Sequence, residues 1–246
     1  MRLNKRYFEY SKGKVPFILS CPHGGYKKPN HIPDKLNGFK VPDENTYLIA
    51  KHIVQRLQEK NIQPYYILCK IHRCKVDLNR PTRFQSAFNQ DCERAKEMHE
   101  YYHNKLNEYA SECIEKYGYC LVIDIHGFTK PMDKYPDIIF GHVFSNTLNV
   151  IRDMEKEDCN KYWGCRDLTL ELKKHFSLDN GLEITDFNLS YSGGYITYQF
   201  YQRENVSAIQ LEIAKYIRQK VELTNTFIER FIIAIEKILN DDVGNK

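Results

Sequence analysis

Apolar and polar residues alternate along the chain with two different periods. Short, almost continuous apolar runs predict buried strands at 15–20, 63–69, 119–125, 137–144 and 208–213. Longer stretches with apolar residues at helical spacing predict amphipathic helices at 43–61, 91–118 and 225–239. Strands of this kind between such helices are typical of a largely parallel sheet covered on both faces. We therefore predict an α/β fold, with Asp91 capping the second helix and Gly118 ending it.

Composition indicates one globular, intracellular domain. The chain has 246 residues, of which 42% are hydrophobic and 28% charged, and no linker, repeat or low-complexity tract divides residues 1–246. We find no signal peptide and no apolar run near the roughly 20 residues that span a bilayer, so we expect a cytoplasmic protein without a membrane partner. The eight cysteines are then expected as buried, reduced thiols.

The net charge of +4 is mild, and Lys and Arg are interspersed with Asp and Glu. A basic balance and 18 tyrosines leave a nucleic-acid-associated protein as a weak alternative. Because the basic residues form no concentrated stripe, we expect no nucleic-acid partner. The sequence gives no indication of the oligomeric state.

Three ionisable residues fall at the carboxyl ends of predicted strands. His23 follows the first strand, His126 follows the run 119–125, and Glu212 lies near the end of 208–213. Ligands of open α/β sheets bind beyond these strand ends, so we expect the three side chains to meet. Each has an ordinary alternative, because an isolated histidine is usually structural and a carboxylate at a strand end can cap a helix.

Two imidazoles and one carboxylate would suit a catalytic zinc, which needs about three protein ligands and one open position. The segment "PDENT" offers Asp43 and Glu44 at the start of a helix, where one can cap while the other binds metal. Asp124 precedes His126 by two residues on a strand, so both side chains point the same way. Asp124 is therefore a candidate to orient that histidine, or a buried carboxylate with another partner.

Two further segments carry candidate substrate-binding groups. In "HRCKVDLNRP", Arg73, Asp77, Asn79 and Arg80 are crowded together. A guanidinium that grips a carboxylate in two places is a common feature of small-acid pockets, although a surface salt bridge explains the same residues. The glycine pair in "YSGGYIT" lets the backbone approach a ligand closely, or forms a tight turn.

The motifs "PHGG", "DENT", "DLNRP", "YYHNKL", "VIDIHG", "DIIFG", "SGGYIT" and "AIQLEI" occur in an order that resembles the N-formylglutamate amidohydrolase family. The resemblance runs from about Pro16 to about Arg218. It implies a three-layer α/β/α domain with a central mixed, mostly parallel sheet, like that of the zinc carboxypeptidases and aspartoacylase. It also implies one zinc ion per chain.

The resemblance also implies a role for each candidate residue. Zinc ligands would be His23, His126 and, in preference to Asp43, Glu44. Glu212 would be the catalytic base and Arg73 would polarise the scissile carbonyl. The substrate would be bound by Asn79, Arg80, Ser192, Gly193 and Gly194.

The sequence departs from the family after both histidines, where members commonly have serine. Gly24 and Gly127 stand in those places, and we expect them to reshape the floor of the pocket. The predicted function is zinc-dependent hydrolysis of a small N-acyl amino acid of the N-formylglutamate type, with a metal-activated water and a glutamate base. Two alternatives remain, a non-catalytic ligand- or partner-binding member of the fold and a zinc peptidase that acts on peptides.

Overall fold

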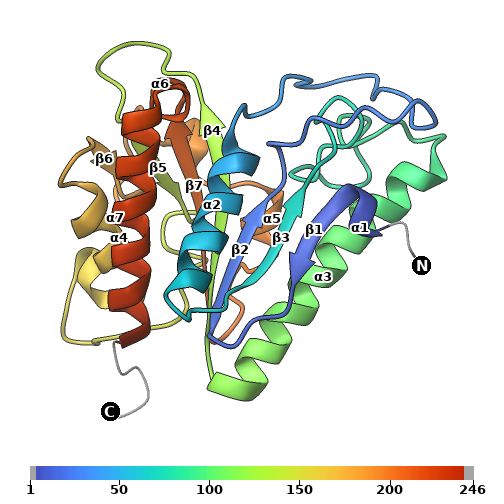
Figure 1. Ribbon diagram of the computed structural model, residues 1–246. Helices are drawn as coiled ribbons and strands as arrows, with labels where there is room; N and C mark the ends of the chain where they lie inside the picture. Colours follow the sequence, from blue (N-terminus) through green and yellow to red (C-terminus); the bar gives the residue numbers. More distant parts are fainter. Residues whose placement is uncertain (1–3, 241–246) are drawn as a thin grey trace.

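A seven-stranded mixed sheet forms the centre of the computed structural model, which describes residues 4–240 (Figure 1). The strands lie in the order β1-β3-β2-β4-β7-β5-β6. Their bounds are Phe8–Ser11 (β1), Phe17–Cys21 (β2), Tyr65–Cys69 (β3), Cys120–Phe128 (β4), Ile138–Gly141 (β5), Leu178–Asp179 (β6) and Val206–Ala214 (β7). The central strands β3, β2, β4 and β7 are parallel, whereas β1 and β5 pair antiparallel with their inner neighbours.

Helices cover both faces of this sheet. One face packs against α2 (Thr46–Glu59), α4 (Cys165–Leu172), α6 (Lys215–Gln219) and α7 (Val221–Asn240). The other face packs against α3 (Glu93–Tyr117) and the short α5 (Tyr195–Tyr198). The remaining elements are α1 (Asn4–Tyr7), η1 (Asp158–Lys161) and η2 (Leu189–Tyr191). In Figure 1, α2 and α7 lie across the sheet from α3, which confirms the three-layer α/β/α arrangement.

The strands β2 and β4 are buried on both faces because successive side chains enter different cores. Leu121 and Ile123 join the core under α2 and α7, while Val122 between them joins the core under α3. Such strands read as continuous apolar runs, which is why the sequence pattern located them.

Every predicted strand and helix is present, with two differences that bear on function. The strand predicted at 119–125 continues to Phe128, so His126 lies within β4. The prediction that Asp91 caps α3 is wrong: the helix begins at Glu93 after Cys92, and the Asp91 N–H instead donates to Asn89 Oδ1. Gly118 ends α3 with a φ of 82°, a left-handed conformation that suits glycine.

Composition predicted buried, reduced cysteines and no membrane-spanning segment. All eight cysteines carry free thiols, and six of them are buried. Within residues 4–240, no helix combines the length and apolar character needed to cross a bilayer.

Candidate metal centre

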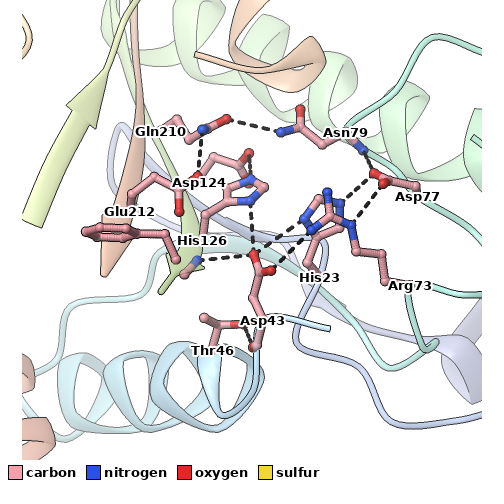
Figure 2. A network of polar contacts seen from close by, with 12 residues as sticks. His23, Asp43, Thr46, Arg73, Asp77, Asn79, Asp124, His126, Gln210 and Glu212 are labelled. Carbon is pink, nitrogen blue, oxygen red and sulfur yellow. Dashed lines mark hydrogen bonds and ion pairs between the residues drawn. The ribbon is translucent and has the colours of Figure 1, made fainter. Parts of the chain in front are cut away.

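Strands β2, β4 and β7 bring three ionisable side chains together at their carboxyl ends. His23 lies two residues beyond β2, and His126 and Glu212 are register partners on the neighbouring strands β4 and β7. All three side chains are buried. The two imidazole rings stand nearly perpendicular, at 85°, with their centroids 4.8 Å apart. The expected meeting of these residues at one edge of the sheet is what the structure shows (Figure 2).

Asp43 completes the cluster by pointing its carboxylate between the two rings. Asp43 Oδ2 lies 3.5 Å from His23 Nδ1 and 3.4 Å from His126 Nδ1. The backbone N–H of Gly127 donates to the same oxygen at 3.1 Å. Because the Thr46 hydroxyl donates to the Asp43 carbonyl, the turn before α2 is closed while the Asp43 side chain stays free to face the histidines.

A second carboxylate holds each imidazole from its other nitrogen. His23 Nε2 lies 2.7 Å from Asp77 Oδ1, and His126 Nε2 lies 2.7 Å from Asp124 Oδ2. By donating to a carboxylate, Nε2 keeps its proton, so Nδ1, which faces Asp43, is the nitrogen that can bind a metal ion. This is the orienting contact for which Asp124 was a candidate.

Asp77 is stabilised as an anion by its surroundings. Its Oδ2 accepts from Lys35 Nζ at 3.0 Å and from Arg73 Nε at 2.9 Å, and its Oδ1 accepts from the Asn79 N–H at 3.1 Å. Burial acts to raise the pKa of Asp77, but its contacts with His23, Arg73 and Lys35 hold the pKa well below its ordinary value. Lys35 has no exposed surface, and no local sequence pattern predicted that it would be buried.

The cluster fits a divalent metal ion. His23 Nδ1 is buried without a hydrogen-bond partner among the described residues, an arrangement that is unfavourable unless another group binds there. One ligand atom each from His23, Asp43 and His126 lie within 4.8 Å of one another. Donors about 2.0–2.2 Å from a tetrahedral zinc ion are about 3.3–3.5 Å apart. The two nitrogen–oxygen separations, 3.5 and 3.4 Å, match that geometry.

The geometry favours Asp43 over Glu44 as the third ligand, contrary to the preference drawn from the family resemblance. The Glu44 side chain is half exposed, and its Oε2 lies 3.7 Å from Lys215 Nζ. Asn45, the next residue, has a φ of 67°, so the chain turns sharply where α2 begins. Neighbouring side chains consequently point in different directions, and only Asp43 points toward the imidazoles.

The charges inside the cluster shift two pKa values strongly. Burial acts to lower the pKa of His126, but Asp124, with contributions from Asp43 and Glu212, raises it to about 10. Burial acts to raise the pKa of Asp43, but the neighbouring His126 and His23 side chains outweigh it and lower the pKa. In the metal-free protein the His126 imidazolium supplies positive charge that a bound dication would otherwise provide.

Glu212 has a proton affinity suited to acid–base chemistry. Burial raises its pKa to about 7, opposed by the charge of His126. Gln210 Nε2 donates to Oε1 at 3.0 Å, whereas Oε2 is buried without a partner among the described residues. The sequence reasoning missed Gln210, although its position two residues before Glu212 on a strand places it on the same face.

A cavity of about 430 Å³ opens over this cluster. Arg73, Asn79, Arg80, Gly193 and Gly194 line it, as expected for substrate-binding candidates. Arg80 is exposed, and no carboxylate within the described chain lies at ion-pair distance from its guanidinium, which reaches only the Asn79 carbonyl at 3.4 Å. Arg73 Nη1 lies 3.3 Å from Asp43 Oδ1.

The "SGG" segment is only partly in the cavity wall. Ser192 is not among the lining residues, and its carbonyl accepts from the Val143 N–H at 2.6 Å. A Cβ at Gly194 would lie 2.0 Å from Asn79 Nδ2, so glycine allows Asn79 to pack here. Asn79 Oδ1 then accepts from the Ile196 N–H at 2.9 Å and its Nδ2 donates to Gln210 at 3.1 Å.

Other protein atoms fill the space beside Gly24 and Gly127, and Gly127 lines the cavity, so the expectation that these glycines reshape the pocket floor stays a prediction. A Cβ at Gly24 would lie 2.2 Å from the backbone nitrogen of Tyr47. A Cβ at Gly127 would lie 2.4 Å from the guanidinium carbon of Arg218. Both glycines permit close packing around the cluster.

Comparisons with known proteins agree with this fold. The family model of N-formylglutamate amidohydrolase matches residues 85–217, a range that contains His126 and Glu212. No curated protein matches the chain in sequence. The crystal structure of N-formylglutamate amidohydrolase from Ralstonia eutropha JMP134 superposes with a TM-score of 0.67 at 14% identity, covering 94% of this chain and 97% of that one. The structure of a gene product from Agrobacterium tumefaciens superposes with a TM-score of 0.66 at 14% identity, covering 94% of each chain.

Proposed function

The chain belongs to the N-formylglutamate amidohydrolase family, a group of hydrolases acting on amide C–N bonds, and from this we propose that it is a zinc-dependent hydrolase of a small N-acyl amino acid such as N-formylglutamate. The observation that carries the proposal is the pair of Nδ1 atoms facing Asp43 beside the unpartnered oxygen of Glu212. The continuous sheet supports treating residues 1–246 as one catalytic domain.

His23, Asp43 and His126 would hold one zinc ion. When bound there, zinc supplies Lewis acidity, which polarises an amide carbonyl and lowers the pKa of water. Asp77 and Asp124 keep the two Nδ1 atoms available by accepting hydrogen bonds from the two Nε2 atoms.

Glu212 is assigned as the proton carrier. Its Oε2 accepts a proton from the attacking water, whose oxygen bonds to the acyl carbon, and the C–N bond then breaks as Glu212 gives that proton to the departing nitrogen. A pKa near 7 suits a group that must both take up and release a proton. Gln210 holds Oε1, so Oε2 is the oxygen left for this exchange.

Two arginines of the cavity wall are assigned to the negatively charged oxygens of the reacting substrate. Arg73 is assigned to the negative charge that develops on the carbonyl oxygen, since its guanidinium already contacts Asp43 at the centre of the cluster. Arg80 is assigned to the substrate carboxylate, because it lines the cavity and has no carboxylate partner within residues 4–240. Asn79 shapes the wall beside Gly194.

The test is metal content together with hydrolysis of N-formyl-L-glutamate. Wild type should contain one zinc ion per chain and release formate, and both should fall for His126→Ala. His52→Ala removes an exposed histidine of α2 and is the matched control, which should keep both. Equal zinc content in wild type and His126→Ala would contradict the assignment.

The same measurements, extended to other N-acyl amino acids and to peptides, separate the two alternatives. A non-catalytic member of the fold would bind zinc at this centre and hydrolyse no N-acyl amino acid. A peptidase would release amino acids from peptides faster than from N-formyl-L-glutamate.

A further inference from the structure

The loop between β2 and α2 places two exposed apolar side chains in the wall of the cavity. Phe39 is 70% exposed and Val41 is 61% exposed, and both line the cavity over the histidine–aspartate cluster. Single exposed apolar residues are common on protein surfaces and need no explanation. These two differ because they face the same cavity as the candidate catalytic residues.

The loop is anchored at several points, so the two side chains are held in place. Lys35 is fully buried, and its Nζ donates to Ser86 O at 3.0 Å as well as to Asp77. Asn37 Nδ2 donates to Gln85 Oε1 at 2.8 Å. Gly38, with a φ of +80°, then turns the chain against Ser86.

Phe39 is also tied to the polar centre. The guanidinium carbon of Arg73 lies 5.8 Å from the centroid of the Phe39 ring, within the range of a cation–π contact. Val41 precedes Asp43 by two residues, and the Asp43 N–H donates to the His23 carbonyl at 3.1 Å. Phe39 therefore contacts Arg73, and Val41 is close in sequence to Asp43 of the metal-binding cluster.

The residues assigned to the substrate carboxylate come from another part of the wall. Asn79, beside Arg80, packs against Gly194 and bonds to Ile196 and Gln210. An N-acyl amino acid has its carboxylate on one side of the amide and its acyl group on the other. With the carboxylate at Arg80 and the amide over the cluster, the acyl group has the Phe39 and Val41 side of the cavity available.

We propose that Phe39 and Val41 form an acyl subsite, and that the enzyme prefers N-acyl amino acids with an alkyl acyl group longer than formyl. This inference rests on the proposed amidohydrolase function. The cavity of about 430 Å³ is consistent with it. Pockets of about 300–1,000 Å³ hold drug-sized ligands, which are larger than N-formylglutamate. A formyl group has no methylene to place against the two side chains, and a longer chain would cover them.

The expected effect follows from the apolar surface that each added carbon covers. A fully buried methylene changes an equilibrium about fourfold, and a half-buried one about twofold. From N-formyl- to N-butanoyl-L-glutamate, three carbons are added. The kcat/KM of wild type should therefore rise by roughly ten- to sixtyfold along the series formyl, acetyl, butanoyl.

The experiment measures this series on zinc-loaded wild type, on Phe39→Ala/Val41→Ala and on Leu36→Ala. The double variant should lose the preference, so that its butanoyl-to-formyl ratio of kcat/KM approaches one. Leu36→Ala is the matched control: Leu36 is 63% exposed on the same loop and is not among the residues that line the cavity. This control should keep the wild-type ratio.

Binding separates failure of the subsite from failure of the proposed function. The affinities of the same N-acyl glutamates are measured by calorimetry on Glu212→Gln and on that variant combined with Phe39→Ala/Val41→Ala. Affinity that rises with acyl length only when Phe39 and Val41 are present supports the subsite, even if wild type hydrolyses none of the compounds. A flat or falling series overturns it, in kcat/KM for wild type or, if wild type hydrolyses none of the compounds, in affinity for Glu212→Gln.

Discussion

The guanidinium of Arg218 occupies the space that a side chain at Gly127 would need. A Cβ at Gly127 would lie 2.4 Å from both the guanidinium carbon and Nε of Arg218, and 2.8 Å from its Nη2. Arg218 is buried and donates to three backbone carbonyls, those of Ile213 at 3.0 Å, Phe128 at 3.2 Å and Glu44. Each carbonyl lies within two residues of Glu212, His126 or Asp43. One side chain thereby ties together the three segments that carry the candidate site.

Gly127→Ser should therefore weaken both folding and metal binding. Forcing a side chain into a packed site typically destabilises by about 1–3 kcal/mol, and displacement of Arg218 would also loosen the segment that presents Asp43. Urea unfolding of the metal-free protein and zinc affinity by chelator competition measure the two effects. In a double-mutant cycle, the Ser substitution should be less harmful in the Arg218→Ala background. Strictly additive effects would show that the two residues are not coupled.

Asp43→Ala should abolish stoichiometric zinc binding, whereas Glu44→Ala should leave it near the wild-type level. The reason is that Asp43 Oδ2 lies 3.5 and 3.4 Å from the two Nδ1 atoms, while the Glu44 carboxylate lies beside Lys215 at 3.7 Å. The adjacent substitutions are matched in residue type and backbone position. Zinc per chain after dialysis against a weak chelator is the measurement. If Glu44→Ala loses its zinc and Asp43→Ala keeps it, Glu44 is the third ligand, as the family resemblance implies.

The apolar pattern of the sequence predicted the central strands but not the sheet edges. Strands β2 and β7 are buried throughout and β4 at all but one residue, so most of their residues are apolar. The strand β1, "FEYS", is half-buried along most of its length, and β6 has two residues. Elements this short and this exposed carry no period that distinguishes them from loops.

Within the site, sequence position located His23, His126 and Glu212 because strand ends converge in a parallel sheet. It did not separate Asp43 from Glu44, since that choice depends on the turn at Asn45 and on the Gly127 N–H, 84 residues from Asp43. The sequence did not predict the burial of Lys35 because this, too, depends on a residue distant in sequence. Its burial depends on Asp77, 42 residues away, and nothing in its own neighbourhood indicates it.

Glu212→Gln should keep the metal and lose turnover. Glutamine preserves the shape of the side chain but cannot accept a proton from water, and loss of a general base typically lowers the rate by about 10²–10⁴-fold. Glu212 is absent from the His23–Asp43–His126 ligand group, so zinc content should stay at the wild-type level. The measurement is kcat for the best N-acyl glutamate, with zinc per chain determined on the same sample. Wild-type turnover in this variant would make Glu212 a structural residue.

The metal-free protein should become less stable, relative to Glu212→Gln, as pH rises from about 4.5 to about 7. Burial raises the folded-state pKa of Glu212 to about 7 from its ordinary 4.5, so the unfolded state releases this proton first. The contribution of the protonated carboxyl is fully present below about 4.5 and is lost as pH passes through about 7. The stability difference between the two proteins should change by on the order of 3 kcal/mol across that window. Urea unfolding at several pH values, in the presence of chelator, tests this; a difference that does not vary with pH would contradict the raised pKa.

Arg80→Lys should weaken the use of substrates with a free α-carboxylate while zinc stays bound. The Arg80 guanidinium lies in the cavity wall, and no carboxylate of residues 4–240 lies at ion-pair distance from it. A guanidinium binds a carboxylate through two parallel N–H donors, and an ammonium group does not reproduce that geometry. Loss of a charge-assisted hydrogen bond covered by substrate would cost roughly 1.5–3 kcal/mol, which is about ten- to a hundredfold in kcat/KM.

A pair of substrates isolates this effect, one with its α-carboxylate free and one with it amidated. Wild type should strongly prefer the free acid, and Arg80→Lys should lose much of that preference because only the free acid uses the guanidinium. Arg83→Lys is the matched control: Arg83 is exposed, stacks on Phe84 with 5.0 Å between its guanidinium carbon and the ring centroid, and is not among the residues that line the cavity. If wild type hydrolyses both substrates equally well, the pocket does not recognise a carboxylate through Arg80, and acceptance of peptides, whose interior residues have no free α-carboxylate, becomes the better explanation of the cavity.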